Sequence, residues 1–268
     1  MLSGIVLAAI FQLNEFYHLC IMPHFLTSEL YFPDVEKADA SGLLAIGGDL
    51  SVKRLLLAYS SGLFPWYEGG YPILWWSPDP RMVLFPDRIK ISKSLQQRIK
   101  KQDFEIRVDT SFSQVIRLCA TSGGRFKVGT WITPEMVEAY IKLHREGYAH
   151  SFETWHKGKL VGGLYGISLG RAFFGESMFY LEPDASKIAL VYLAGLMREL
   201  KFEFIDVQQE TQHLKSMGAT LLSRRVFMIL LKKALDHETI TGKWTKFGDQ
   251  NNSLKKISDE FVSRRIYG

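Results

Sequence analysis

A run of strand-forming sequence between residues 151 and 208 constrains the fold of this chain more than any other feature. Its β-branched and aromatic residues, broken by glycines, predict three adjacent strands over 151–156, 159–168 and 171–179. A helix is expected from Ser186 to about Leu200, followed by one more strand over 202–208. Hairpin strands, a helix and a further strand together predict a mixed sheet of the α+β class. Bulges or close approaches are expected at Gly162, Gly163 and Gly166.

Helix signals flank this run on both sides. Ser51 is placed to cap a helix over 52–61, and Thr133, followed by Pro134, is placed to cap a helix over 134–146. Further helices are predicted over 92–101, 112–121 and from Arg224 to about His237. Residues 64–88 are rich in proline and glycine, so we expect an ordered loop with little regular structure there.

The character of the sequence changes near residue 85, which suggests two domains. We expect a loop-rich N-terminal domain over 22–85, a second domain of helices and strands over 86–240 and a polar, lysine-rich, flexible tail over 241–268. Residues 1–21 are interpreted as an upstream extension, because Met22 begins a more natural start. No Lys or Arg precedes Lys37, which argues against a signal peptide, and no stretch reaches the roughly 18 apolar residues that cross a bilayer.

The composition permits many functions and excludes few. The 268 residues are 47% hydrophobic and 23% charged, which is typical of globular proteins. A net charge of +5 permits an anionic partner such as RNA without requiring one. Two cysteines cannot support a disulfide framework or a four-cysteine zinc site, so we expect a reducing, cytoplasmic compartment. No metal-ligand cluster or nucleotide loop is apparent, and neither a metal nor a cofactor is predicted.

Five short motifs carry more specific information. In chain order they are Leu63-Phe64-Pro65-Trp66, Trp75-Trp76-Ser77-Pro78-Asp79-Pro80-Arg81, Gly129-Thr130-Trp131-Ile132-Thr133, Gly175-Glu176-Ser177-Met178-Phe179 and Ile205-Asp206-Val207-Gln208. Together they resemble the leucyl/phenylalanyl-tRNA–protein transferase family, over about residues 30–235. The resemblance implies an acyl-CoA N-acyltransferase-like catalytic domain. It also implies transfer of Leu or Phe, with Met a poorer donor, from charged tRNA to proteins with N-terminal Arg or Lys, which marks them for degradation under the N-end rule.

The candidate catalytic pair is Asp206 and Gln208, at the end of the last predicted strand. A period of two places both side chains on one face of that strand. We expect the carboxylate to orient and polarise the Gln208 amide, whose carbonyl oxygen then faces an incoming amine. On its own, an Asp-x-Gln sequence at a strand end equally suits a loop cap. The family resemblance places the catalytic pair on these two residues, without deciding which one takes the proton.

Other candidate residues follow from what the two substrates require. The resemblance implies that Glu176 holds the aminoacyl end of the tRNA; a cationic acceptor side chain or a structural ion pair are alternative partners. Aromatic rings can stack on the terminal adenosine, and the candidates are Trp66 and Trp131, with Tyr59 and Tyr140 as weaker neighbours. Trp75 and Trp76 are assigned to the domain junction, with an Arg81–Asp79 pair. The candidate pocket for the Leu or Phe side chain is Leu164, Met178, Leu190, Leu193 and Met197, although a stripe at helical spacing is more often plain core.

Basic residues near the start of the second domain are candidates for contacts to the tRNA backbone. They are Lys90, Lys93, Arg98, Lys100 and Lys101, with Lys187 at a helix N-terminus as a further phosphate ligand. A solvated helix face is the alternative. The expected partners are therefore an aminoacyl-tRNA and an acceptor protein, with the enzyme acting as a monomer away from membranes.

Two other functional classes remain open from the sequence. A CoA-dependent N-acetyltransferase would share the fold but needs a glycine-rich pyrophosphate loop, where this chain has Glu182-Pro183-Asp184-Ala185-Ser186-Lys187. A non-catalytic RNA-binding module would explain the charge and the aromatics, but not the Asp206 and Gln208 pair or the apolar pocket.

Overall fold

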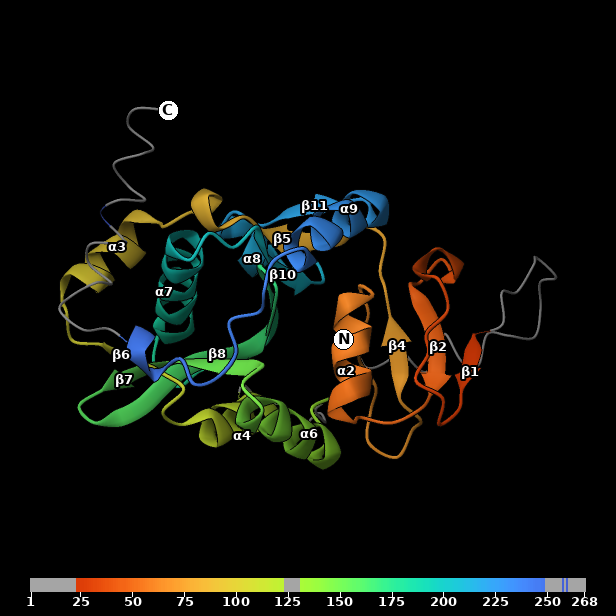
Figure 1. Ribbon diagram of the computed structural model, residues 1–268. Coiled ribbons are helices and arrows are strands. Elements are labelled where there is room, and N and C mark those ends of the chain that lie inside the picture. Colours follow the sequence, from red (N-terminus) through yellow and green to blue (C-terminus); the bar gives the residue numbers. More distant parts are fainter. Residues whose placement is uncertain (1–22, 123–130, 249–256, 258, 260–268) are drawn as a thin grey trace.

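The computed structural model of the chain describes residues 23–122 and 131–248, together with Ile257 and Asp259. These residues form a small four-stranded sheet beside a larger seven-stranded sheet, with helices packed around both (Figure 1). This arrangement confirms the α+β class. Among the described residues, no helix has the length and apolar character needed to span a membrane. The extension expected over residues 1–21 lies outside the described part of the chain.

The small sheet is built from the N-terminal part of the chain. Its order is β1-β2-β4-β3, with β1 parallel to β2 and the other pairs antiparallel. The strands are β1 (His24–Leu26), β2 (Leu43–Gly47), β3 (Phe64–Pro65) and β4 (Leu74–Trp76). Helix α2 (Val52–Ser60) begins as predicted at Ser51, whose side chain accepts a hydrogen bond from the Arg54 amide. The chain leaves α2 through Gly62, which has a φ of 77° that glycine adopts without strain.

The larger sheet has the order β11-β5-β10-β9-β8-β7-β6. Its only parallel pair among the described strands is β9 with β10. The strands are β5 (Arg81–Leu84), β6 (Glu105–Val108), β7 (Ala149–His156), β8 (Lys159–Leu169), β9 (Ala172–Tyr180), β10 (Phe204–Gln208) and β11 (Thr220–Leu222). Three antiparallel strands, a helix and a strand that adds in parallel form the mixed sheet that the sequence predicts.

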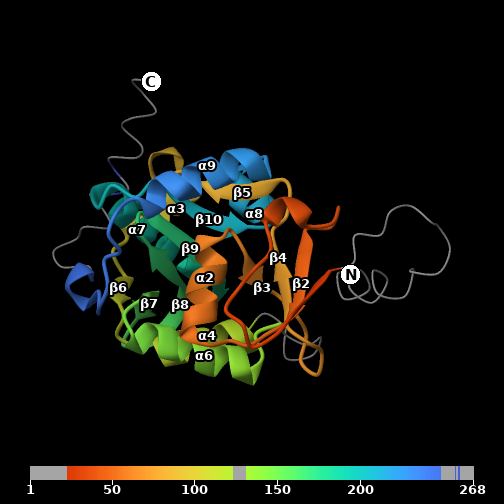
Figure 2. The same ribbon diagram turned by 45° about the vertical axis from the view of Figure 1, so that its right-hand side comes forward.

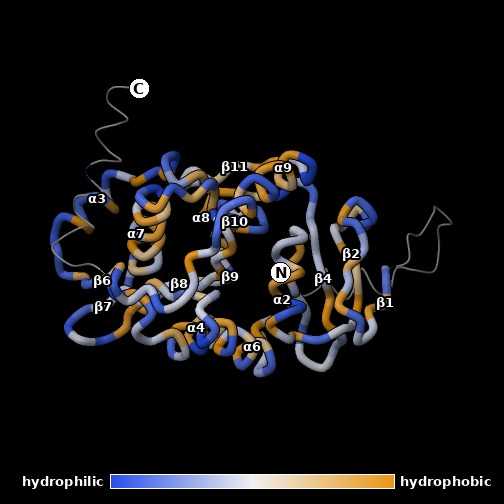
Figure 3. Tube along the Cα trace, viewed as in Figure 1, coloured by the Kyte–Doolittle hydropathy of each residue, from blue (hydrophilic) through white to orange (hydrophobic). Residues whose placement is uncertain are grey.

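Helices cover both faces of this sheet and create two hydrophobic cores. Helices α4 (Phe112–Thr121) and α6 (Pro134–Arg145) lie on one face, with α2 and the small sheet packed into the same core. Helices α3 (Lys93–Lys100) and α7 (Ala185–Glu199) form the second core on the other face (Figure 2). Figure 3 shows α7 mostly in the hydrophobic half of the scale, because this helix is buried on nearly all sides. Helices α8 (Gln212–Ser216) and α9 (Arg224–Leu235) follow β10.

The predicted helices and long strands are confirmed, but the interpretation of residues 64–88 as loop is wrong. This segment contains β3, β4, β5 and the short 3-10 helix η2 (Pro86–Arg88), and β5 lies inside the larger sheet between β11 and β10. The strands are only two to four residues long and prolines stand at their ends, so the turn signals mask them. A second 3-10 helix, η1 (Val35–Lys37), also precedes β2.

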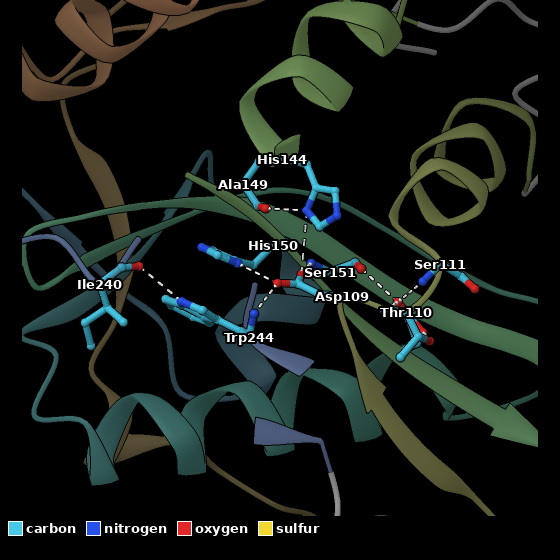
Figure 4. Close-up of polar contacts among 10 residues, drawn as sticks. Asp109, Thr110, Ser111, His144, Ala149, His150, Ser151, Ile240 and Trp244 are labelled. Carbon is cyan, nitrogen blue, oxygen red and sulfur yellow. Dashed lines mark hydrogen bonds and ion pairs between the residues drawn. The ribbon is translucent and has the colours of Figure 1, made fainter. Parts of the chain in front are cut away.

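The first part of the expected C-terminal tail is packed rather than flexible. Trp244 is fully buried, its ring stacks on His150 with centroids 3.7 Å apart, and its amide donates to Asp109 (Figure 4). Directly after it lies η3 (Thr245–Phe247), and the Phe247 carbonyl accepts a hydrogen bond from Tyr192. Burial of one tryptophan outweighs the polar composition of its neighbours. Except for Ile257 and Asp259, residues 249–268 lie outside the described part.

Candidate active site

Two β-bulges open the larger sheet near its centre. On β10, Val207 is left unpaired between Asp206 and Gln208; on β9, Glu176 is the extra residue opposite β8. The parallel pairing of β9 with β10 ends at Phe174 and Asp206, although β9 continues to Tyr180. Because a bulge bends its strand and re-aims side chains, the two strands separate beyond these positions. The opening lies at the carboxyl ends of both strands.

A cavity of about 240 Å³ occupies this opening. Residues from the small sheet, from β9, from the end of β10 and from α8 surround it: Phe64, Pro65, Trp66, Trp131, Glu176, Ser177, Met178, Val207, Gln208, Gln209, Thr211 and Leu214. It therefore lies between the two sheets and brings together four of the motifs seen in the sequence. A larger hollow elsewhere, lined by Arg88, Lys201 and Glu203 among others, contains none of the predicted catalytic residues.

A buried chain of hydrogen bonds leads from this cavity into the first core. The Gln208 Nε2 group donates to Glu176 Oε1 at 2.8 Å, and the Tyr140 hydroxyl donates to Glu176 Oε2 at 3.0 Å. The hydroxyls of Tyr140 and Tyr59 are hydrogen-bonded in turn. Since the amide nitrogen of Gln208 faces Glu176, its carbonyl oxygen is directed away from that carboxylate. These hydrogen bonds fix the side chains of Gln208 and Glu176, which both line the cavity.

The environment of Glu176 changes its titration. Burial raises the pKa of Glu176 to about 7, and the nearby Asp206 charge adds to that increase, while hydrogen bonds from Tyr59, Tyr140 and Gln208 oppose it. Burial and the Glu176 charge together raise the pKa of both Tyr59 and Tyr140 well above the usual value. Glu176 therefore changes its protonation state near neutral pH, while both hydroxyls remain protonated.

The relation predicted between Asp206 and Gln208 is wrong in detail. The bulge breaks the period of two, and Gln208 has a φ of 62°, in the left-handed region that few non-glycine residues adopt. Asp206 accepts a hydrogen bond from the backbone amide of Gln208 at 2.9 Å, whereas the carboxylate next to the Gln208 side chain is Glu176. Asp206 is fully buried and does not line the described cavity.

Arg81 is the partner of Asp206, not of Asp79 as the sequence suggested. Its Nε and Nη2 groups donate to the two Asp206 oxygens at 2.9 and 2.6 Å. Asp79 instead accepts a hydrogen bond from the backbone amide of Arg224 at 3.0 Å. The sequence does not predict that Arg81 faces Asp206, because turn signals mask the short strand β5 and its antiparallel pairing with β10. An arginine beside the apolar Met-Val-Leu run nevertheless indicates a buried charge that requires a partner.

The four aromatic candidates divide into two pairs. Trp66 and Trp131 are half-buried and both line the cavity. Tyr59 and Tyr140 are fully buried, so their rings offer no free face to a base, and this part of the prediction is wrong. Their hydroxyls support Glu176 instead. Burial of a tyrosine whose hydroxyl has a polar partner is common and leaves no separate signal in the sequence.

The predicted apolar pocket is only partly present. Met178 lines the cavity, and its other apolar walls come from Phe64, Pro65, Val207 and Leu214. The remaining predicted members belong to the second core and do not line the described cavity; they are Leu164, Leu190, Leu193 and Met197. All four are at most 3% exposed. The helical stripe on α7 thus reflects packing against the sheet.

The basic candidates on α3 lie away from this cavity. Figure 1 shows α3 at the end of the molecule opposite β4, the strand paired with β3. Arg98 forms ion pairs with Asp103 and with Glu182, and Lys187 forms one with Asp184 at 2.7 Å, so these two cations are already matched. The other predicted cations are exposed; they are Lys90, Lys93, Lys100 and Lys101. Their contact with tRNA stays a prediction.

Comparison with known proteins matches most of this chain to one family. The family model described as leucyl/phenylalanyl-tRNA protein transferase matches residues 83–232, and the model of its N-terminal domain matches 48–79. The leucyl/phenylalanyl-tRNA–protein transferase of Legionella pneumophila (strain Corby) is 54% identical over 218 residues, which cover 81% of this chain and 97% of that protein. That of Thermodesulfovibrio yellowstonii is 50% identical over 242 residues, 90% of this chain and 99% of the relative.

A solved structure, that of L-PGS from Bacillus licheniformis, aligns over 72% of this chain and 71% of its own with 11% identity and a TM-score of 0.35, too weak a likeness to support a conclusion. The sequence relatives and both family models are sufficient without it. This chain belongs to the leucyl/phenylalanyl-tRNA–protein transferase family.

Proposed function

We propose that this protein transfers Leu or Phe from aminoacyl-tRNA to the N-terminal Arg or Lys of acceptor proteins, which marks them for degradation. Its membership of the family supports an enzyme that uses an aminoacyl-tRNA and a protein acceptor. The observation that carries the assignment is that Gln208, Glu176, Trp66 and Trp131 all line the same cavity. We further propose that the enzyme acts as a cytoplasmic monomer and needs no cofactor beyond the charged tRNA.

The cavity offers a distinct place for each part of the donor. The terminal adenosine stacks on Trp66 and Trp131, a contact worth about 1–3 kcal/mol per base. The Leu or Phe side chain packs against Met178, Val207 and Leu214, which are apolar and line the same cavity. A flexible thioether such as that of Met178 adapts to either an aliphatic or an aromatic guest. The ester carbon then lies close to Gln208 and Glu176.

The reaction is an aminolysis. The α-amine of the acceptor attacks the ester carbonyl, a C–N bond forms, and the bond to the 3′ oxygen of the adenosine breaks. That oxygen takes up the proton that the amine loses, so the tRNA departs with a free hydroxyl. The Gln208 carbonyl oxygen accepts a hydrogen bond from the amine and aligns it, while Glu176 orients the Gln208 amide. Since an N-terminal amine has a pKa of about 7.7–8.0, alignment rather than strong base supplies most of the acceleration.

The local charge near α7 disfavours acetyl-CoA as the donor. Asp184 occupies the N-cap of this helix in a left-handed conformation, and its carboxylate pairs with Lys187 at 2.7 Å. A pyrophosphate at a helix N-terminus needs a positive field, and a carboxylate at the N-cap weakens that field.

The test is direct transfer of label. The purified protein is incubated with radiolabelled Leu-tRNA and an Arg-initiated model protein, and in parallel with labelled acetyl-CoA. We expect label on the acceptor only from the tRNA, and only when the acceptor begins with Arg or Lys. Acetylation without aminoacyl transfer would overturn the proposal. RNA binding without either reaction would favour the non-catalytic alternative.

A further inference from the structure

The ion pair between Arg81 and Asp206 is the most deeply buried charge interaction beside the site. Arg81 is 1% exposed and Asp206 is 0% exposed. Two parallel hydrogen bonds, 2.9 and 2.6 Å long, join the guanidinium to the carboxylate. This fork geometry fixes direction as well as charge, which a lysine cannot do. The carboxylate is consequently held in one orientation.

The guanidinium is itself held by two separate parts of the chain. Its centre lies 4.6 Å from the ring of Phe64 and 4.7 Å from that of Phe227. Its Nη1 group also donates to the carbonyl of Gly62 at 3.3 Å. Phe64 belongs to β3 and lines the cavity, whereas Phe227 belongs to α9. Arg81 thus joins the small sheet and α9 to the end of β10.

The same carboxylate controls the backbone of Gln208. Asp206 Oδ1 accepts both the Arg81 Nε–H bond and the backbone N–H of Gln208, each at 2.9 Å. Gln208 follows the bulge with a φ of 62°, a conformation that persists only where its surroundings enforce it. This backbone turn directs the Gln208 side chain to Glu176, 2.8 Å away.

We infer that Arg81 is a positioning residue that acts through Asp206 to hold the backbone of Gln208 in its reactive conformation. Asp206 serves as a backbone anchor in this arrangement and takes no proton from the acceptor amine. Three observations support the inference: Asp206 does not line the cavity, both of its oxygens are engaged by Arg81, and its contact with Gln208 is to the main chain. The inference rests on the proposed function.

The first test replaces Arg81 by Lys and measures aminoacyl transfer. Arg81→Lys keeps the charge but loses the fork, and misplacement of a reacting group by about 1 Å can cost about 100-fold in rate. We expect kcat to fall about 10- to 100-fold while KM for both substrates changes less than about twofold. The pH profile of kcat should keep its midpoint, since Glu176 is untouched. An unchanged kcat, or a loss confined to KM, would overturn the inference.

A second pair of variants decides the question even if Arg81→Lys does not fold. Asp206→Asn keeps an oxygen that can accept the Gln208 backbone N–H, whereas Asp206→Ala has none. We expect Asp206→Asn to retain kcat within about tenfold of wild type and Asp206→Ala to lose about 100-fold. Equal losses in both would show that keeping an acceptor for the Gln208 backbone N–H makes no difference to the rate, contrary to the inference. The wild-type reaction is the separate control, because its absence would instead defeat the proposed function.

Discussion

At the scale of single residues, the site depends on a few buried polar groups whose partners the sequence could not reveal. The motifs identify Glu176, Asp206 and Gln208 as chemistry-bearing residues, and all three lie close together. Their contacts depend on two bulges and on the short strand β5, which the sequence does not predict. The bulges place Glu176 beside Gln208, and β5 places Arg81 beside Asp206. Residue types were therefore predictable from motifs, whereas their pairing was not.

The raised pKa of Glu176 predicts a pH-dependent stability. Folded protein binds a proton at Glu176 up to about pH 7, while the unfolded chain releases it near the ordinary value of 4.5, so stability falls as pH rises between these values. Glu176→Gln removes this penalty of about 3 kcal/mol. We expect the unfolding free energy of Glu176→Gln to exceed that of wild type by more at pH 8 than at pH 5, as measured by chemical denaturation.

The exposed Glu199 provides a matched control for that measurement. Glu199→Gln makes the same chemical change at the protein surface, so it measures the effect of the substitution without burial. A Glu176→Gln variant whose stability relative to wild type does not depend on pH would show that Glu176 is already ionised in the folded protein at pH 5.

At the scale of elements, helices with clear caps were predictable and short strands were not. Thr133 and Pro134 define the start of α6, and glycine-broken β-branched sequence defines β7, β8 and β9. The two-residue β3 and the four-residue β5 are specified by their partners across the sheet, which a local pattern does not contain. The bulges have the same origin, since they are defined only by register between strands.

The bulge on β9 depends on a glycine across the strand pair. A Cβ atom on Gly166 would lie 2.2 Å from the Phe174 carbonyl oxygen and 2.5 Å from the Phe173 ring. We expect Gly166→Ala to destabilise the fold by about 1–3 kcal/mol or more, measured by thermal unfolding. Gly69→Ala is the control, because its nearest atom would be 4.0 Å away. Equal stability of the two variants would contradict this packing.

At the scale of the whole molecule, the cavity lies where the small sheet meets the larger one. Neither part alone contains the site, since Phe64 and Trp66 come from one and Glu176 and Gln208 from the other. The family models divide the chain at nearly the same place, between residues 79 and 83. Because the site is divided between the two sheets, the aminoacyl-tRNA and the protein N-terminus can meet in the cavity between them.

The proposed stacking of the adenosine on Trp66 and Trp131 predicts a loss of donor affinity when either ring is removed. Trp66→Ala and Trp131→Ala should each raise KM for Leu-tRNA by roughly 5- to 150-fold, corresponding to about 1–3 kcal/mol, with a smaller effect on KM for the acceptor. The half-buried Trp155 does not line the cavity, and Trp155→Ala is the control. If all three variants bound the donor equally well, the adenosine would lie elsewhere.

Exposed lysines around α3 predict a salt-dependent contact with the tRNA backbone. Replacing Lys93, Lys100 and Lys101 together by Gln should weaken Leu-tRNA binding and reduce the slope of log affinity against log salt. A short aminoacylated adenosine donor lacks the rest of the tRNA backbone. The wild type and the triple variant should therefore react with it equally well. An unchanged salt slope would identify these residues as a solvated helix face.

The most direct measurement compares single-turnover transfer of Leu to an Arg-initiated protein by wild type, Gln208→Ala and the exposed Gln97→Ala. Since we propose that Gln208 aligns the amine, we expect Gln208→Ala to slow transfer by about 100-fold or more, while Gln97→Ala stays at the wild-type rate. Wild-type transfer by a folded Gln208→Ala variant would contradict the placement of the reaction in this cavity.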